Sequence, residues 1–225
     1  MRIPPVTKNL LIITALCFFA SVVAQRYGLN LNSILGLHFF KASDFNLYQL
    51  ITYMFMHANF EHIFFNMFAL WMFGRTLEQV WGGKRFLFFY IVCGVGAGLV
   101  QESVKYIEYV TTLSQYDGVN TGVGVMPMGE YLNLMNTVGA SGAIYGILLA
   151  FGMTFPNSQM FVFPIPFPIK AKWFVIGYAL IELVLGVGAS SDGIAHFAHL
   201  GGMIFALILI LYWKKKDKNN GGFYY

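Results

Sequence analysis

Charged residues are scarce in this sequence. They make up 11% of the 225 residues, against 57% hydrophobic residues, and the mean hydropathy is +0.63. Ordinary soluble domains contain about 25% charged residues, so the composition excludes that class. The net charge of +4 could indicate a nucleic-acid partner, but the basic residues stand at the ends of apolar segments rather than in one patch. We therefore expect a chain that has the lipid bilayer as its main partner and no nucleic-acid partner.

Cysteine is also rare, with two residues in the whole chain. Cys17 and Cys93 each lie inside an apolar segment, without the spacing or the partners that a disulfide framework or a metal site requires. The sequence therefore predicts neither.

Long apolar segments are abundant, and a helix needs about 20 residues to cross a bilayer. The first segment follows Arg2 and Lys8 and could be a signal-peptide core. We favour a span because no small-residue cleavage site precedes the polar stretch and further spans follow. The predicted fold is an all-α integral membrane protein with six transmembrane helices, at residues 9–24, 62–77, 86–100, 138–155, 173–188 and 194–213.

Six crossings place both termini on one side of the membrane. Only Arg26, Lys41 and Lys105 of the 14 basic residues then fall on the opposite side, so the positive-inside rule predicts that both termini are cytoplasmic. We expect residues 1–213 to form a single membrane domain and residues 214–225 a short, basic and disordered tail.

Three connectors have a recognisable character. Residues 26–61 form a long loop in which the apolar stretch 47–56 is typical of an interfacial element. Residues 101–137 are rich in glycine and predict a flexible outer loop. Residues 155–168 contain four prolines, which cannot continue a helix.

A polar side chain inside a membrane is costly and needs a partner or a function. Ser141 opens the fourth span between Gly139 and Gly142, and Gly146 follows on the same helix. Free N–H groups at a helix start favour an anion, which suits an attacking hydroxyl that generates an oxyanion. Taken alone, however, the pattern describes a helix start beside a packing seam better than a nucleophile.

A serine nucleophile needs an adjacent base, and histidine is the usual one. His199 has Gly202 at i+3 and Ala206 at i+7, so it lies on a stripe of small residues that lets its helix approach the Ser141 helix closely. His196 has no such stripe. We interpret His199 as the base and His196 as a hydrated residue at the mouth of the span.

His62 and Asn66 lie one helical turn apart and face the same way. Both can donate a hydrogen bond, and two donors aimed at one point form an oxyanion hole. They could equally be hydrogen-bonding links between helices. His57 and Asn59 precede the span and are interpreted as structural contacts with the first loop.

Four motifs in order make this sequence resemble the rhomboid family of intramembrane serine proteases. The resemblance covers residues 53–205 and includes Tyr145, whose counterpart stacks on the catalytic imidazole. The first loop lacks the family's Trp-Arg pair, and Ala206 replaces a usual glycine. The motifs are His-Ala-Asn-Phe-Glu-His-Ile-Phe-Phe-Asn at 57–66, Gly-Arg-Thr-Leu-Glu at 74–78, Gly-Ala-Ser-Gly at 139–142 and Ala-His-Leu-Gly-Gly at 198–202.

The resemblance implies a six-helix bundle that cuts peptide bonds with a Ser141–His199 dyad and no metal or cofactor. His199 would act as general base and then as general acid. The oxyanion would bind the backbone N–H of Ser141 together with His62 and Asn66. The residues expected to support this site are Gly139, Tyr145 and Gly202. No acid partner for the histidine stands at an obvious position.

Substrates implied by the resemblance are single-span membrane proteins, cut near the outer leaflet where their helix unwinds. We expect a multi-pass protein of the bacterial inner membrane. Two alternatives remain open: a catalytically silent relative that binds membrane clients, and a small transporter. Glu182 in the fifth span fits transport best, although we favour a snorkelling or interhelically bonded carboxyl group.

Overall fold

The computed structural model describes residues 2–122, 124–161, 166–188 and 195–219, most of them helical. The longer helices are α1 (Pro5–Arg26), α4 (Phe60–Ala69), α6 (Gly83–Thr111), α8 (Ser141–Thr154), α9 (Ala171–Val187) and α10 (His196–Asn219). Shorter helical elements are α2 (Leu31–Leu35), α3 (Gln49–Thr52), η1 (Tyr53–Phe55), the π-helical turn η2 (Leu70–Gly74), α5 (Arg75–Trp81), η3 (Leu113–Gln115) and α7 (Met128–Leu134).

The connectors between the helices also contain short strands. They form two-stranded antiparallel sheets because each pair bridges two loop segments whose backbone groups would otherwise lack partners. Within the described ranges the pairs are β1 (Leu37–His38) with β4 (Asn136–Thr137), β2 (Gly118–Asn120) with β3 (Val125–Pro127), and β5 (Gln159–Met160) with β6 (Ile169–Lys170).

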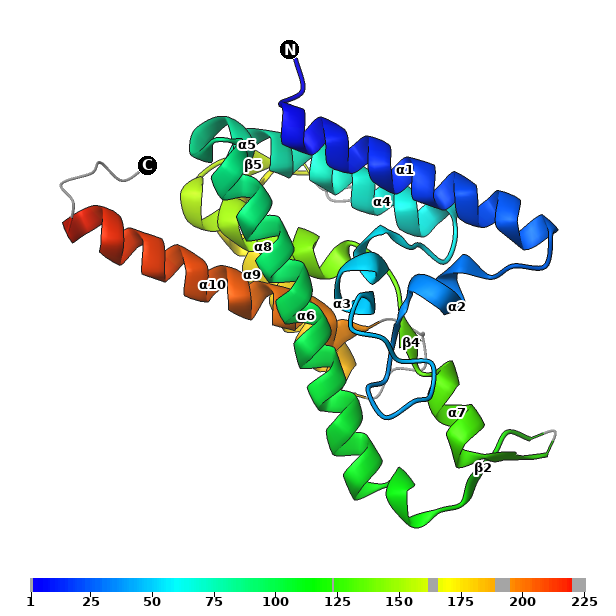
Figure 1. Cartoon of the computed structure of the whole chain (residues 1–225). Coiled ribbons are helices and arrows are strands. Elements are labelled where there is room, and N and C mark those ends of the chain that lie inside the picture. Colours follow the sequence, from blue (N-terminus) through cyan, green and yellow to red (C-terminus); the bar gives the residue numbers. More distant parts are fainter. Residues whose placement is uncertain (1, 123, 162–165, 189–194, 220–225) are drawn as a thin grey trace.

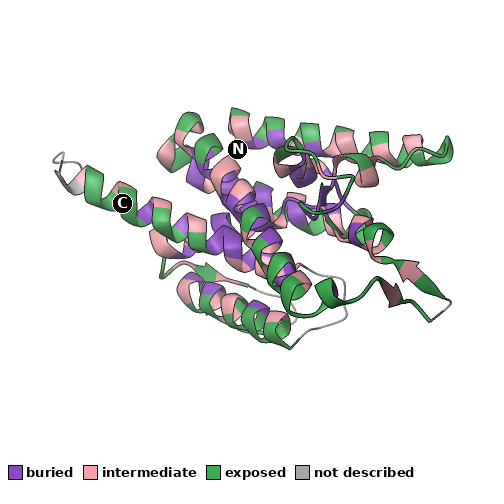
Figure 2. Cartoon of the chain, turned by 60° about the horizontal axis from the view of Figure 1, so that its bottom comes forward, coloured by how far each residue is buried: buried purple, intermediate pink, exposed green. Residues whose placement is uncertain are grey.

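The centre of the bundle is the group α6, α8 and α10, which pack against one another (Figure 1). Helix α8 is the most enclosed, with buried residues on all sides, and α9 packs on its outer side together with α10. Helix α1 lies along α4 and η2 on the opposite flank. Figure 2 shows buried residues gathered in the middle and exposed ones along the outer helices. Many exposed residues are large and apolar, as expected of surfaces that face lipid.

Three of the described helices are long and apolar enough to cross a membrane, at Pro5–Arg26, Gly83–Gln115 and His196–Asp217. Helix α8, at 14 residues, is about 21 Å long, which is shorter than the hydrocarbon core. The structure therefore supports a helical membrane fold, and the count of six spans stays a prediction.

Two sets of contacts hold the start of α1 and the C-terminal part of α10 in the bundle. Glu78 accepts hydrogen bonds from the backbone N–H groups of Val6 and Thr7 at the start of α1, at 2.9 and 2.7 Å, where a carboxylate also complements the helix dipole. Arg85, at the start of α6, forms an ion pair with Asp217 at 3.3 Å. Figure 1 shows the start of α1 at the top, the end of α10 at the left and the β2–β3 hairpin at the lower right.

The predicted disordered tail is partly wrong, because α10 continues to Asn219. Besides its ion pair with Asp217, Arg85 stacks over the Trp213 ring at 4.2 Å, and these contacts join the C-terminal part of α10 to the start of α6. Residues 220–225 of the predicted tail lie outside the described residues.

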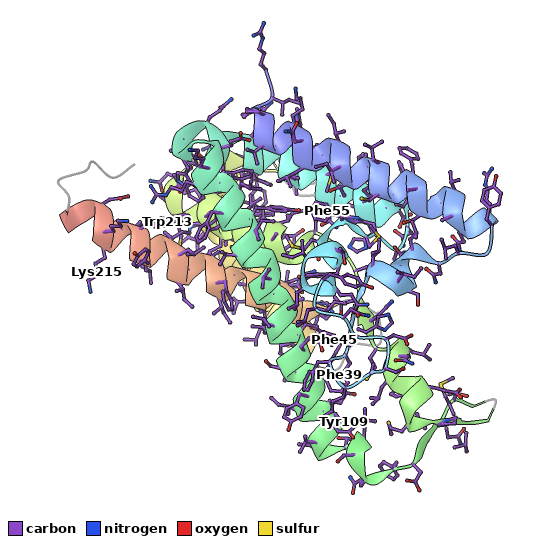
Figure 3. The ribbon with its side chains drawn as sticks, in the orientation of Figure 1. Phe39, Phe45, Phe55, Tyr109, Trp213 and Lys215 are labelled. Atoms are coloured by element: carbon purple, nitrogen blue, oxygen red, sulfur yellow. The ribbon has the colours of Figure 1, made fainter. Side chains whose placement is uncertain are left out.

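The connector predicted to be a flexible loop is more ordered than its glycines indicate. Helix α6 runs on to Thr111, and η3, the β2–β3 hairpin and α7 follow. Phe39 of the first loop packs against Tyr109 of this extension, with ring centroids 5.8 Å apart (Figure 3). Apolar packing against the extended helix thus orders this connector despite the glycines in its hairpin.

The first loop is anchored by a buried ion pair instead of the missing Trp-Arg pair. Glu102 accepts from the backbone N–H of Phe40 at 2.8 Å and pairs with Lys105 at 3.2 Å. Lys105 in turn donates to the Met135 carbonyl at 2.7 Å and to Thr137 Oγ1 at 3.1 Å. The network joins the first loop, α6 and the segment that leads into α8.

Candidate active site

Glycine allows α8 and α10 to touch through their backbones. A Cβ added to Gly202 would lie 1.8 Å from the carbonyl oxygen of Gly142, and one added to Gly142 would lie 2.3 Å from Cβ of Ala97. No side chain fits in either place. Because α8 and α10 approach so closely, side chains from the two helices can touch although they are far apart in the sequence.

Ser141 is the first residue of α8. Strand β4, paired with β1, ends four residues earlier, and Gly139 N–H donates to the Tyr53 carbonyl at 2.9 Å. Gly139 has φ +127°, a conformation that L side chains rarely adopt. The glycine thus lets the chain turn sharply from the strand into the helix and fixes where the serine hydroxyl lies.

The structure brings Ser141 and His199 together. The serine Oγ lies 2.8 Å from His199 Nε2. Tyr145, one turn along α8, stacks on the imidazole with a centroid distance of 4.2 Å and an angle of 7° between the ring planes. The ring is therefore held in the plane that directs Nε2 to the hydroxyl.

A cavity of about 790 Å³ opens over this pair. Its wall combines polar groups from α4, α6 and the 136–139 segment with the dyad itself. The described residues that line it are Tyr53, Ala58, Asn59, Glu61, His62, Phe65, Asn66, Gln101, Lys105, Asn136, Thr137, Val138, Gly139, Ser141, Gly142, Tyr145, Ala195, Ala198 and His199.

His62 and Asn66 face this cavity from α4. The His62 ring is so close to the nucleophile turn that a Cβ on Gly139 would lie 2.7 Å from its Nε2. The amide nitrogen of Asn66 is buried and has no hydrogen-bond partner among the described residues. A buried donor without a partner is costly, and an anionic oxygen in the cavity would satisfy it.

His57 and Asn59 make structural contacts with the first loop and with the start of α4. Asn59 caps α4 by accepting from His62 N–H at 2.8 Å, and the His57 carbonyl accepts from Asn32 of the first loop at 3.1 Å. Burial, together with the neighbouring His62, lowers the pKa of His57 to about 3. Its imidazole therefore stays neutral near pH 7.

Glu182 is the site residue whose role the sequence did not reveal. This carboxylate is 5% exposed and lies behind the imidazole, outside the lining of the cavity. Its Oε2 is 2.9 Å from Nδ1 of His199 and 2.6 Å from Nδ1 of His196, and its Oε1 accepts from the Tyr145 hydroxyl. Interhelical bonding is therefore its structural role, and His199 has an acidic neighbour after all.

His196 requires a correction. It is buried, with 5% exposure, and is not a hydrated residue at the mouth of the span. The prediction went wrong because the carboxylate that contacts His196 comes from α9, and no sequence pattern on α10 points to it. A carboxyl group in the fifth span is costly unless it has a partner, and this cost was the sequence signal for the contact.

Glu182, His196 and His199 also form the group of described residues nearest to a metal site. Their ligand atoms lie within 4.8 Å of one another, and two histidines with a glutamate can ligate zinc. Here Oε2 sits at hydrogen-bond distance from one histidine ring nitrogen and in close contact with the other. These contacts are those of a carboxylate–histidine cluster.

Apolar helices around a serine–histidine pair, with a polar cavity above it, define a class of integral membrane proteins with a hydrolase-like site. Comparison with known proteins identifies the group within that class. The family model described as the rhomboid domain matches residues 44–216. The chain belongs to the rhomboid family.

Individual relatives agree with this assignment. The chain is 33% identical over 164 residues to the rhomboid protease AarA of Providencia stuartii, covering 71% of this chain and 53% of that protein. It is 25% identical over 213 residues to the chloroplastic rhomboid-like protein 11 of Arabidopsis thaliana, covering 81% and 61%. It is 26% identical over 163 residues to the mitochondrial rhomboid protein 1 of Saccharomyces cerevisiae, covering 72% and 40%. The chain thus spans about half the length of these relatives.

Proposed function

We propose that this protein is an intramembrane serine endopeptidase that cuts single-span membrane proteins. The observation that carries the proposal is the 2.8 Å contact between Ser141 Oγ and His199 Nε2 at the wall of a polar cavity. A rhomboid protease among the relatives supports it. A serine and a histidine in contact are the nucleophile and base that acyl transfer requires.

Each proton in the reaction has a place to go. Ser141 Oγ attacks the peptide carbonyl carbon while its proton passes to His199 Nε2, which then delivers that proton to the leaving amine. Water hydrolyses the acyl-enzyme by the same route in reverse. The backbone N–H of Ser141, with His62 and Asn66, would stabilise the oxyanion in both steps.

The membrane arrangement is part of the proposal. We place six spans in the bilayer with both termini in the cytoplasm, because only Arg26, Lys41 and Lys105 of the 14 basic residues then fall on the opposite side. The cavity then opens toward the outer face, where an unwound substrate helix can present its peptide bond. Relatives in a bacterium, a chloroplast and a mitochondrion lend no support to the expectation of a bacterial inner membrane in particular.

Cleavage of a single-span reporter by the purified protein in proteoliposomes tests the proposal. Ser141→Ala and His199→Ala should each bring cleavage below detection, since loss of a serine or histidine of this kind costs on the order of 10⁶-fold in kcat. Ser103→Ala is the matched control, because Ser103 is exposed on α6 and its hydroxyl bonds to the Leu99 carbonyl of the same helix. It should cleave like the wild type.

A fluorophosphonate probe separates the competing functions. It should label the wild type and Ser103→Ala but not Ser141→Ala. A wild type that binds clients without cleaving them or taking up the probe would identify a silent relative. Full cleavage by His199→Ala together with loss of cleavage in His196→Ala would show that His196, and not His199, is the base.

A further inference from the structure

We infer that Glu182 positions His199, so that the nucleophile works as part of a serine–histidine–glutamate arrangement rather than as a dyad alone. The inference rests on the proposed peptidase function and extends it to a third residue, supplied by α9. Glu182 does not touch the substrate in this scheme. It acts through the imidazole.

The imidazole of His199 lies between the serine hydroxyl and the carboxylate. Ser141 Oγ contacts Nε2 on the cavity side of the imidazole at 2.8 Å, and Glu182 Oε2 lies 2.9 Å from Nδ1 on the far side. The second contact is bent away from straight hydrogen-bond geometry. Contacts of this kind in a site without substrate are commonly bent and tighten when substrate binds.

The position of the carboxylate dictates the proton on the histidine. An ionised carboxyl group only accepts hydrogen bonds, so the nitrogen that faces Glu182 must carry the proton when the ring is neutral. Nδ1 then bears hydrogen, and Nε2 presents its lone pair to the serine hydroxyl. That is the tautomer that a general base requires.

Two further donors keep Glu182 in the charged form. His196 Nδ1 approaches Oε2 at 2.6 Å, and the Tyr145 hydroxyl donates to Oε1. Donors to a carboxylate favour its ionised state. When His199 takes the serine proton, the new imidazolium faces this negative charge, which stabilises the ion pair that forms in the transition state.

The surroundings of Glu182 argue against a carboxylate that merely ties helices together. Every neighbour named above belongs to the catalytic pair or to the residues around it, and the Tyr145 ring that donates to Glu182 is the same ring that stacks on His199. The imidazole is therefore held from three sides, by the stacked ring, the nucleophile and the carboxylate.

Steady-state cleavage by Glu182→Gln tests the inference. Glutamine keeps the shape but lacks the charge, and it can present an amide donor to Nδ1 and so favour the wrong tautomer. We expect kcat to fall on the order of 10²- to 10⁴-fold with KM within about twofold, and Glu182→Asp to recover part of the loss. The matched control is Glu130→Gln, an exposed glutamate on α7 outside the cavity lining, which should behave like the wild type. Wild-type kcat in Glu182→Gln would overturn the inference.

The pH dependence of kcat/KM distinguishes positioning from a purely structural contribution. A negative charge beside the ring favours its protonated form, so removal of that charge should move the acid limb of the profile to lower pH. The other titratable groups that face His199 are His196, Tyr145 and His62, and all remain in both proteins. A lower rate with an unmoved acid limb would mean that Glu182 only supports the fold.

Nitrogen-15 NMR of the wild-type histidines gives a test that needs no variant at Glu182. The His199 signal, assigned by its loss in His199→Gln, should report hydrogen on Nδ1, and hydrogen on Nε2 would refute the inference.

Activity should also survive a metal chelator. Loss of cleavage on chelation, restored by zinc, would make the cluster a metal site instead. If the wild type cleaves no reporter, the proposed peptidase function is wrong. The tautomer measurement still tests whether Glu182 sets the position of the proton on His199.

Discussion

The central helices and the flanking helix α9 are packed in opposite ways. In the centre, a Cβ on Gly202 would lie 1.8 Å from a backbone oxygen, so α8 and α10 are already in backbone contact and leave no room for a side chain between them. On α9, only Ala171, Val175 and Glu182 are buried, and Val184 is 68% exposed. One region is held by contact between backbones, and the other rests on a few side chains.

This difference assigns different tasks to the two regions. The distance between nucleophile and base must stay constant to a fraction of an ångström for the reaction. This pair lies in the tightly packed central region. The carboxylate behind the base comes from the helix with the weaker packing. Movement of α9 would therefore change the setting of His199 before it changed the contact with Ser141.

Adding one methyl group to the centre should have the largest effect. In Gly202→Ala the new Cβ meets the Gly142 carbonyl, which is backbone and cannot rotate away. We expect a loss of about 1–3 kcal/mol in the free energy of unfolding and at least about 10²-fold in cleavage, because the helices must separate. Thermal unfolding in detergent and reporter cleavage measure both effects. Unchanged values in both assays would show that the central helices are not packed as described.

Asn66→Ala should affect the reaction and leave the fold intact. The amide nitrogen of Asn66 has no partner among the described residues, so its removal breaks no hydrogen bond of that donor. If it serves the oxyanion, kcat should drop about 10²- to 10³-fold while the unfolding temperature stays within error. A drop in unfolding temperature with normal kcat would instead make Asn66 a structural residue on the α4 flank.

Much of the central region could be predicted from sequence because its cause is local. Stripes of glycine and alanine on two apolar helices require close packing, and they place Ser141 and His199 on facing surfaces. The helix ends were harder to predict. Helix α6 reaches Thr111 because residues of the first loop pack on it, a cause that lies some 70 positions earlier in the chain.

The environment of Glu182 was beyond local reasoning for a similar reason. Hydropathy marks a carboxyl group in an apolar segment as unusual, but it does not say which helix supplies the partners. Three side chains from α8 and α10 converge on it only after the bundle forms. The anchor of the first loop, Glu102 with Lys105, likewise depends on segments distant in sequence.

The smallest effect should come from the same glycine-to-alanine change on α9. A Cβ on Gly177 meets nothing within 4 Å, and alanine is a better helix former than glycine by about 1 kcal/mol. Gly177→Ala should therefore unfold at the same or a slightly higher temperature and cleave the reporter at the wild-type rate. Run beside Gly202→Ala, it separates the effect of packing from that of the substitution itself. A large loss of stability in Gly177→Ala would mean that α9 is packed as tightly as α8 and α10, and the contrast between the two regions would then be wrong.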